Sequence, residues 1–277
     1  MSGPLPPGLH IVATPIGNLG DLSPRASETL ERADRILAED TRVTGKLLAH
    51  AGVKTPMLRY DDHSSDADRD RIVAMLGEQA IALVSDAGTP LISDPGYKLV
   101  RAARAAGYSV RTVPGPSAVI AALTLAGLPT DRFLFVGFLP AKAKARSDAI
   151  AEIAGVRATL ALYETGPRLG DTLTALATGL GDREAAVARE LTKLHEECVT
   201  GRLAELAVRY ADAPPKGEIV IVVGPPAEAA QASDADLDCA LDAALQRLSP
   251  SRAAAEVAEQ LNIPRKRAYA RALERAR

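Results

Sequence analysis

Short apolar runs alternate with helix-like segments through the first half of the chain. The apolar runs cover residues 9–13, 35–38, 57–60, 81–84 and 109–113. The segments between them carry helix-start signals, such as Ser23 before Pro24 and Ser65 three residues before Asp68. This order predicts an α/β fold in which helices cover both faces of a mainly parallel sheet.

The alternation is interrupted at residues 127–131, GLPTD, where we predict a domain boundary. A second α/β set follows, with expected strands at residues 133–138, 159–163, 185–189, 197–200 and 218–223. The two strands that flank Lys193 are candidates for an antiparallel pair. We therefore expect an N-terminal α/β domain over residues 1–128, a C-terminal α/β domain over residues 129–226, and a linker with a helical extension over residues 227–277.

Charge and cysteine content exclude several classes of protein. The formal net charge of −2 excludes a globally basic nucleic-acid binder, although a local basic patch remains compatible with it. Cys198 and Cys239 are too few for a disulfide framework or a zinc quartet, which fits a reducing compartment. We find no signal-peptide pattern and no apolar run of bilayer-spanning length, so we expect a soluble, cytoplasmic protein.

The loop after the fourth apolar run has the most unusual composition. It is SDAGTPLISDPG, residues 85–96, and its small residues let the backbone approach a ligand closely. Within it, Asp94 is expected to cap a helix that has Pro95 at its first position. Because a plain strand-to-helix connection is usually shorter, we interpret this stretch as a binding loop.

Three loops of this kind follow strand-like runs, at residues 14–19, 85–90 and 114–118. If the strands are parallel, all three loops gather at one sheet edge and form one pocket. The chain lacks both a GxGxxG run and a Gly-Lys-Ser/Thr phosphate loop, so a ligand without phosphates fits better. Glu39 and Asp40 either hydrogen-bond a ribose or complement the dipole of the helix that follows them.

Two polar groups mark strand ends in the second half, at residues 163–168 and 189–197. Lys193, in the second group, is a candidate general base if burial lowers its pKa, whereas a solvated hairpin tip would have a similar composition. Residues 216–218, Lys-Gly-Glu, are placed to close the same cleft.

Two basic stretches suggest phosphate contacts. The first contains Lys142, Lys144 and Arg146, and the second is the tail at residues 246–277, where eight basic residues face three acidic ones, a local charge of +5. Ordinary solvated surface charge is the alternative for each stretch.

Seven motifs along nearly the whole chain together resemble the tetrapyrrole-methylase superfamily of S-adenosylmethionine-dependent methyltransferases. Within it they are most similar to the ribosomal RNA small-subunit methyltransferase I family. The motifs are ATPIGNLGDLSPRA, AEDTRVTGKLL, SDAGTPLISDPG, VPGPSAV, GLPTDRFLFVGFLP, ARELTKLHEE and KGEIVIVV. The tail SPSRAAAEVAEQLNIPRKRAYARAL resembles the helix-turn-helix-like extension of that family, whereas ETGPR at residues 164–168 departs from its ESPHR form.

The resemblance implies two α/β domains with S-adenosyl-L-methionine in the cleft between them, and a homodimer. It implies methylation of the ribose 2′-oxygen of a decoding-centre cytidine in 16S rRNA of the small ribosomal subunit. The cofactor-binding residues that it implies are Thr14, Pro15, Gly17, Ser85, Asp86, Ala87, Gly88, Thr89, Ser117, Ala118, Tyr163, Lys216, Gly217 and Glu218.

The remaining candidates have roles in RNA binding and proton transfer, and no metal is expected. The expected RNA contacts are Arg42, Lys142, Lys144, Arg146, Arg265, Lys266 and Arg267. A protonated ribose hydroxyl is a poor nucleophile, so Lys193 or Glu190 is expected to accept its proton. The rival interpretations are a tetrapyrrole methyltransferase of the same fold and a non-catalytic nucleic-acid-binding module.

Overall fold

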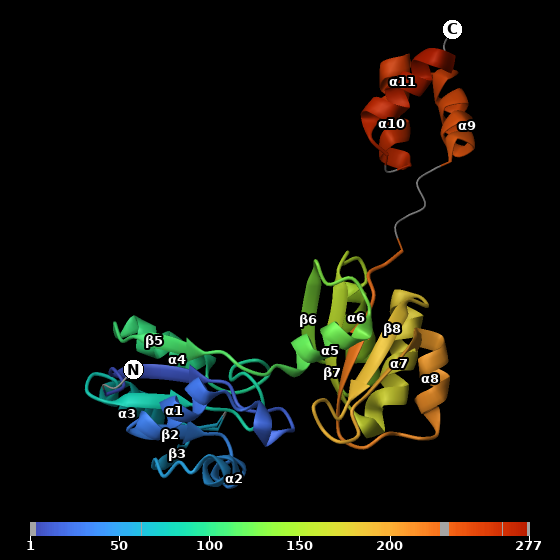
Figure 1. Cartoon of the computed structure of the whole chain (residues 1–277). Coiled ribbons are helices and arrows are strands. Elements are labelled where there is room, and N and C mark those ends of the chain that lie inside the picture. The colour runs from blue at the N-terminus through green and yellow to red at the C-terminus, as the bar shows by residue number, and fades with distance from the viewer. Residues whose placement is uncertain (1–3, 62, 228–232, 262, 276–277) are drawn as a thin grey trace. The chain divides into compact units, whose positions relative to one another are not determined.

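The computed structural model describes residues 4–61, 63–227, 233–261 and 263–275. The chain forms two compact units, Met1–Pro225 and Pro226–Arg277. The first unit contains two five-stranded sheets, and the second contains helices (Figure 1). No helix of the described ranges combines the length and the apolar character that crossing a bilayer requires.

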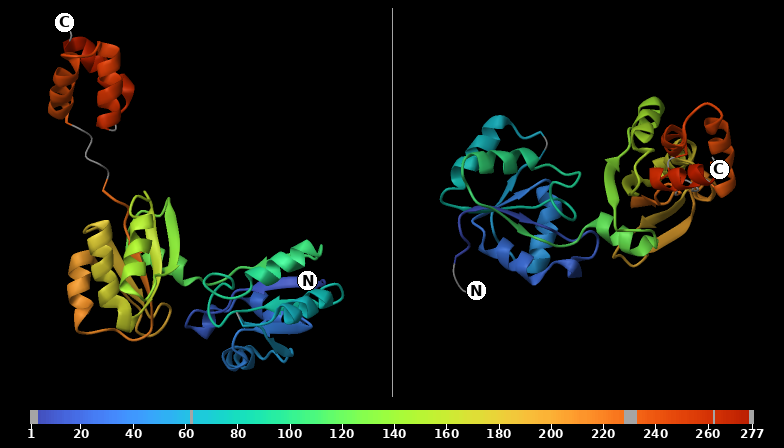
Figure 2. Two further views of the ribbon diagram at one scale, coloured as in Figure 1. Left: turned by 180° about the vertical axis from the view of Figure 1, so that it is seen from behind. Right: turned by 90° about the horizontal axis from the view of Figure 1, so that it is seen from above.

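The first sheet is entirely parallel, as the alternating pattern predicted. Its strand order is β3-β2-β4-β1-β5, and the strands are β1 (Gly8–Val12), β2 (Arg35–Ala38), β3 (Met57–Arg59), β4 (Ala80–Leu83) and β5 (Val110–Val113). Its helical segments are η1 (Leu19–Asp21), α1 (Pro24–Arg32), α2 (Thr41–Ala51), α3 (Asp66–Met75) and α4 (Tyr97–Ala105). Leu30 and Leu48, from α1 and α2, belong to one core cluster, and Ile72 and Leu99, from α3 and α4, to another. Helices therefore cover both faces of the sheet (Figure 2).

Local capping signals predict some helix starts correctly and one wrongly. Ser23 caps α1 through the N–H of Ala26, and Ser65 forms a capping box with Asp68 before α3. Asp94 is not an N-cap, because α4 begins at Tyr97 and its cap is Gly96 at φ +129°. A side chain at position 96 would place its Cβ 2.9 Å from Leu83 Cδ2, so this turn depends on glycine.

The second sheet has the order β6-β7-β10-β8-β9. Its strands are β6 (Phe133–Phe138), β7 (Thr159–Thr165), β8 (Glu184–Arg189), β9 (Glu197–Arg202) and β10 (Glu218–Val223). The pair β6–β7 is parallel, and the other pairs are antiparallel. Strands β8 and β9 flank Lys193, so the antiparallel pair expected there is confirmed.

Helices cover both faces of this sheet as well. Three of them, α6 (Ala143–Ile153), α7 (Gly166–Leu180) and α8 (Leu203–Ala211), share one core with the sheet. The other face packs against α5 (Ala118–Ala126). Helix α5 precedes the boundary expected at residues 127–131, yet its packing partners are strands of the second sheet.

The C-terminal unit contains α9 (Asp234–Leu245), α10 (Pro250–Gln260) and α11 (Arg265–Arg275). One apolar core joins these helices, and it includes Leu237, Leu241, Val257 and Ile263. The helical extension expected for the tail is therefore present in the described residues.

Candidate functional site

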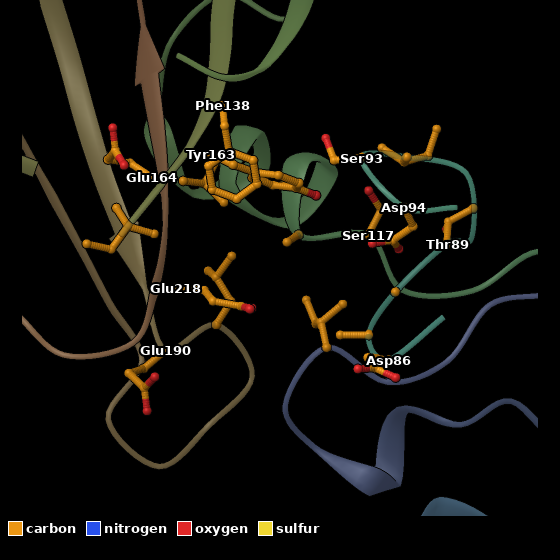
Figure 3. Close-up of a pocket in the computed structure, with 18 of the residues that line it drawn as sticks. Asp86, Thr89, Ser93, Asp94, Ser117, Phe138, Tyr163, Glu164, Glu190 and Glu218 are labelled. Atoms are coloured by element: carbon orange, nitrogen blue, oxygen red, sulfur yellow. The ribbon is translucent and has the colours of Figure 1, made fainter. Parts of the chain in front are cut away.

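A cavity of about 260 Å³ lies within the first unit. Residues after β4 and around the start of α5 line one side, and residues from β7, the β8–β9 loop and β10 line the other (Figure 3). The three small-residue loops gather here because strands β4, β1 and β5 are neighbours in the sheet. The structure thus joins loops that lie about a hundred residues apart in sequence.

Hydrogen bonds hold the three loops together. The backbone N–H groups of Thr14 and Gly88 donate to each other's carbonyls, at 2.8 and 3.1 Å. The buried Thr14 hydroxyl donates to the Ser85 carbonyl at 3.2 Å, and the Thr89 hydroxyl donates to the Pro116 carbonyl at 3.1 Å. The side chain of Thr14 therefore braces the loops.

Most of the residues predicted for cofactor binding and proton transfer meet at the cavity. Those that line it are Asp86, Ala87, Gly88, Thr89, Ser117, Ala118, Tyr163, Glu190, Lys193 and Glu218. The other candidates are among the described residues but do not line the cavity. Those from the predicted cofactor-binding set are Thr14, Pro15, Gly17, Ser85, Lys216 and Gly217. Ten further residues line the cavity: Ile16, Glu39, Ile92, Ser93, Asp94, Phe138, Glu164, Leu191, Ile219 and Val220. Seven of them lie in stretches that the sequence already marked, namely the small-residue loops, the Glu39–Asp40 pair and the two polar groups. Phe138, Ile219 and Val220 lie in apolar strands, where nothing local distinguishes them from core residues.

Asp86 connects two loops and also faces the cavity. Its Oδ1 accepts a hydrogen bond from the backbone N–H of Asp40 at 3.0 Å. Asp40 in turn caps α2 by accepting from the N–H of Arg42 at 2.8 Å, and the Arg42 guanidinium holds the pKa of Asp40 well below its usual range. Of the two acids considered for a ribose contact, Asp40 is the helix cap and Glu39 lines the cavity.

The Tyr163 ring is half-buried at one wall of the cavity. Its ring centroid lies 4.9 Å from that of Phe135 and 5.4 Å from that of Phe138. Burial, with the nearby carboxylates of Asp94 and Glu218, raises the pKa of Tyr163 to about 12. The phenol therefore stays protonated at neutral pH and can donate a hydrogen bond into the cavity.

Glu190 and Lys193 form an ion pair at the cavity, with Nζ 2.9 Å from Oε1. The loop that carries them is strained, because Glu190 and Thr192 have φ values of +50° and +63°. Lys193 was predicted to accept a proton on the condition that burial lowers its pKa. Its side chain is 39% exposed, so that burial is absent.

Two glycines make room for this pair. A Cβ on Gly17 would lie 2.7 Å from Lys193 Cε, and a Cβ on Gly217 would lie 2.5 Å from Glu190 Oε1. Both glycines came from the predicted cofactor set, and both lie against the ion pair.

The cavity is strongly acidic. Six carboxylates line it, and Lys193 is the sole basic side chain among its lining residues; the acids are Glu39, Asp86, Asp94, Glu164, Glu190 and Glu218. Glu164 is 1% exposed and accepts from the Thr172 hydroxyl at 2.6 Å and the Thr165 N–H at 2.8 Å. Such a lining attracts a cationic ligand and disfavours a phosphate.

The predicted RNA-contact residues lie outside the cavity. Arg42 is exposed and bound to Asp40, and Lys144 pairs with Asp148 within α6. Lys142 is exposed at the N-cap of α6, and Arg146 donates to the Ala141 carbonyl at 3.4 Å.

The positive charge of the tail is largely neutralised within the C-terminal unit. Arginines of α11 pair with aspartates of α9; the pairs are Arg267–Asp234, Arg271–Asp238 and Arg275–Asp242. Over residues 233–275, seven basic residues face seven acidic ones. The local charge of +5 was counted over residues 246–277, which do not include the aspartates of α9. Because the folded unit includes them, it is not strongly basic.

The comparisons with known proteins agree with this architecture. Residues 8–207 match the family model described as Tetrapyrrole (Corrin/Porphyrin) Methylases, and residues 231–276 match the model described as RsmI C-terminal HTH domain. The solved uroporphyrin-III-C-methyltransferase from Thermus thermophilus aligns with a TM-score of 0.55 and 23% identity, over 78% of this chain and 93% of its own. That likeness supports the fold.

Relatives named ribosomal RNA small subunit methyltransferase I match nearly the whole chain. The one from Erythrobacter litoralis is 58% identical, over 98% of this chain and 96% of its own length. The one from Xylella fastidiosa strain Temecula1 is 50% identical, over 95% of this chain and 98% of its own. The chain therefore belongs to the tetrapyrrole methylase family and, within it, to the ribosomal RNA small subunit methyltransferase I family.

Proposed function

We propose that this chain uses S-adenosyl-L-methionine to methylate the ribose 2′-oxygen of a decoding-centre cytidine in 16S rRNA. The observation that carries the cofactor assignment is the acidic cavity at the edge of the parallel sheet. Family membership and the names of the relatives support the rRNA substrate. With a ribosomal substrate, the reaction takes place in the cytoplasm.

The cavity suits this cofactor because S-adenosyl-L-methionine carries a sulfonium and an ammonium against a single carboxylate, and has no phosphate. Six carboxylates surround the space, and the chain has no phosphate-binding fingerprint. The residues that would hold the cofactor are Asp86, Thr89, Ser117, Tyr163 and Glu218, all of which line the cavity. When bound, the cofactor supplies a methyl group that its sulfonium has already activated.

The chain's own contribution is orientation and removal of one proton. Holding the 2′-oxygen in line with the methyl group contributes roughly 7–11 kcal/mol when alignment is good. The hydroxyl must also lose its proton, and the Glu190–Lys193 pair provides the acceptor. Lys193→Ala with full turnover and unchanged cofactor binding would exclude Lys193 as that acceptor, and Glu190→Gln tests Glu190 in the same way.

The RNA backbone would contact cations outside the cavity. We assign this role to the exposed Lys142 at the N-cap of α6 and to the exposed Arg265 and Lys266 at the start of α11. The other residues that were expected to contact RNA already have partners: Arg42 pairs with Asp40, Lys144 with Asp148 and Arg267 with Asp234, and Arg146 donates to the Ala141 carbonyl.

We also propose a homodimer, as the family resemblance implies. Helix α5 packs one face on the second sheet and leaves two large apolar side chains, Ile120 and Leu125, exposed. Packing a second copy against them would remove this apolar surface from water. Sedimentation equilibrium measures the oligomeric state directly. A molecular mass equal to that of one chain at all micromolar protein concentrations would contradict this proposal.

One labelling experiment separates the candidate functions. The protein is incubated with methyl-tritiated S-adenosyl-L-methionine and small ribosomal subunits that lack the methyl group. Label in the rRNA, at the 2′-oxygen of one cytidine after nuclease digestion, supports the proposed function. Label only in an added tetrapyrrole supports the small-molecule alternative, and cofactor binding without transfer supports a binding module.

A further inference from the structure

Strand β6 contains a bulge that changes the direction of its last residue. Phe135 pairs with Ala161, but the next pairs are Gly137 with Leu162 and Phe138 with Tyr163. Val136 is therefore an extra residue, and Gly137 adopts φ +74°, which favours glycine. The extra residue reverses the alternation of the strand, so Phe138 lies on the same face as Phe135.

The bulge gives Phe138 an unusual position at the rim of the cavity. Its ring packs against the Tyr163 ring, with centroids 5.4 Å apart, yet 51% of the residue is exposed. Ile92, on the loop after β4, also lines the cavity and is 42% exposed. Figure 3 shows Phe138 beside Tyr163 and across from Ser93. The cavity therefore has carboxylates inside and an apolar rim with an accessible aromatic ring.

The chain after Phe138 is held by Arg168, which in turn pairs with a buried acid. Arg168 Nη2 donates to the Leu139 carbonyl at 2.6 Å, and Arg168 Nε lies 3.3 Å from the buried Glu164. The exposed Lys142 follows three residues later at the N-cap of α6. An anchored ring and a cation for phosphate thus occur within five residues of chain.

We propose that the Phe138 ring is the platform on which the base of the target nucleotide stacks. This inference rests on the proposed function, because it needs a nucleotide substrate. Proteins recognise unpaired RNA bases by stacking them on aromatic side chains, with cations along the backbone. The acidic interior repels phosphates, so the RNA backbone stays outside near Lys142 while the ribose and base enter at the rim.

The test compares Phe138→Ala, Phe138→Leu and Phe138→Trp with the wild type in the labelling reaction. Kinetics with undermethylated small subunits give KM and kcat, and calorimetry gives the Kd for S-adenosyl-L-methionine. Phe138→Ala should raise KM by roughly 5- to 150-fold, the range that corresponds to losing one stacked base. Phe138→Leu should behave similarly, Phe138→Trp should stay near the wild type, and the cofactor Kd should change less than 2-fold, by about the error of such a measurement.

Phe133→Ala is the matched control. Phe133 lies on the same strand with similar exposure, 44%, and is outside the cavity lining, so its KM should equal that of the wild type. If Phe138→Ala alters the melting temperature, the stacking role is tested by comparing Phe138→Leu with Phe138→Trp, because both of these variants keep the apolar bulk.

Three results would overturn the stacking role while leaving the proposed function intact. These are an unchanged KM in Phe138→Ala, wild-type behaviour of Phe138→Leu, and a loss of cofactor affinity that accounts for the whole defect. Absence of label in rRNA with the wild-type protein would instead overturn the proposed function, and the stacking role with it.

Discussion

The Asp86 carboxylate accepts a hydrogen bond from the backbone N–H of Asp40, with 3.0 Å between Oδ1 and the nitrogen. The bond joins the loop after β4 to the loop after β2, two neighbouring strands of the first sheet. Asp86 also lines the acidic cavity. One side chain therefore serves both the fold and the charge of the site, and two substitutions can separate these contributions.

Asp86→Asn keeps an oxygen acceptor for the Asp40 N–H and removes the negative charge, whereas Asp86→Ala removes both. We expect Asp86→Ala to lower the free energy of unfolding by about 1 kcal/mol, the usual contribution of one hydrogen bond, and Asp86→Asn to leave it nearly unchanged. Both variants should bind S-adenosyl-L-methionine more weakly because the cavity is less acidic. Denaturant unfolding and calorimetry measure the two effects, and wild-type affinity in Asp86→Asn would show that the charge is not used.

Gly217 is expected to tolerate no side chain, for two separate reasons. Its φ of +95° is unfavourable for other residues, by roughly 1–2 kcal/mol, and a Cβ would lie 2.5 Å from Glu190 Oε1. Gly107, with φ +81° and no atom within 4 Å of a Cβ, is the control for the first reason alone. Gly217→Ala should lose stability and kcat, and Gly107→Ala should lose only stability. Equal kcat in the two variants would mean that Glu190 moves aside without consequence.

Arg265 and Lys266 are expected to contribute to the salt dependence of RNA binding. Replacing both with Ala should weaken binding and flatten the plot of log K against log salt by about 1.4, since each contact to single-stranded RNA contributes about 0.7. Arg247, already paired with Glu256, is the control, and its Ala variant should keep the wild-type slope. Fluorescence anisotropy with a labelled rRNA fragment measures the slopes, and equal slopes in all three proteins would refute the assignment.

The arginine–aspartate ladder makes the C-terminal unit sensitive to acid. Hydrogen bonds from Arg271 lower the pKa of Asp238 below its ordinary value of about 3.9. The carboxylate form is favoured in the folded unit, so its stabilisation is complete above the unfolded pKa. It disappears as the pH falls through the lower, folded pKa. NMR intensities of α11 amides in the full chain should therefore fall with acid below about pH 4.

Asp238→Asn is the matched variant for this prediction. It removes the titrating group while keeping the size of the side chain, so the α11 amides should lose part of their acid sensitivity. Added salt should weaken the same effect, because the ladder is solvent-exposed. An identical acid transition in the wild type and in Asp238→Asn would show that the ladder contributes nothing.

Much of the fold was predictable because its signals act over a few residues. Alternating apolar runs and helix starts indicated the parallel sheet, and the capping box of Ser65 and Asp68 appears as predicted. The start of α4 was not predictable in this way. Asp94 and Pro95 look like a helix cap, but Leu91 and Ser93 adopt positive φ, and the turn continues to Gly96.

The sequence by itself determined the α/β class, the composition of the three loops and the absence of a phosphate-binding fingerprint. Tertiary structure decided which residues meet. The order β4-β1-β5 brings the three loops to one sheet edge, and the antiparallel second sheet brings Glu190 and Glu218 to the same cavity. Pairs such as Arg271 and Asp238, 33 positions apart, convert an apparently basic tail into a neutral one. Periodicity and capping reach only a few residues along the chain, whereas charge pairing and cavity lining depend on the packing of distant elements.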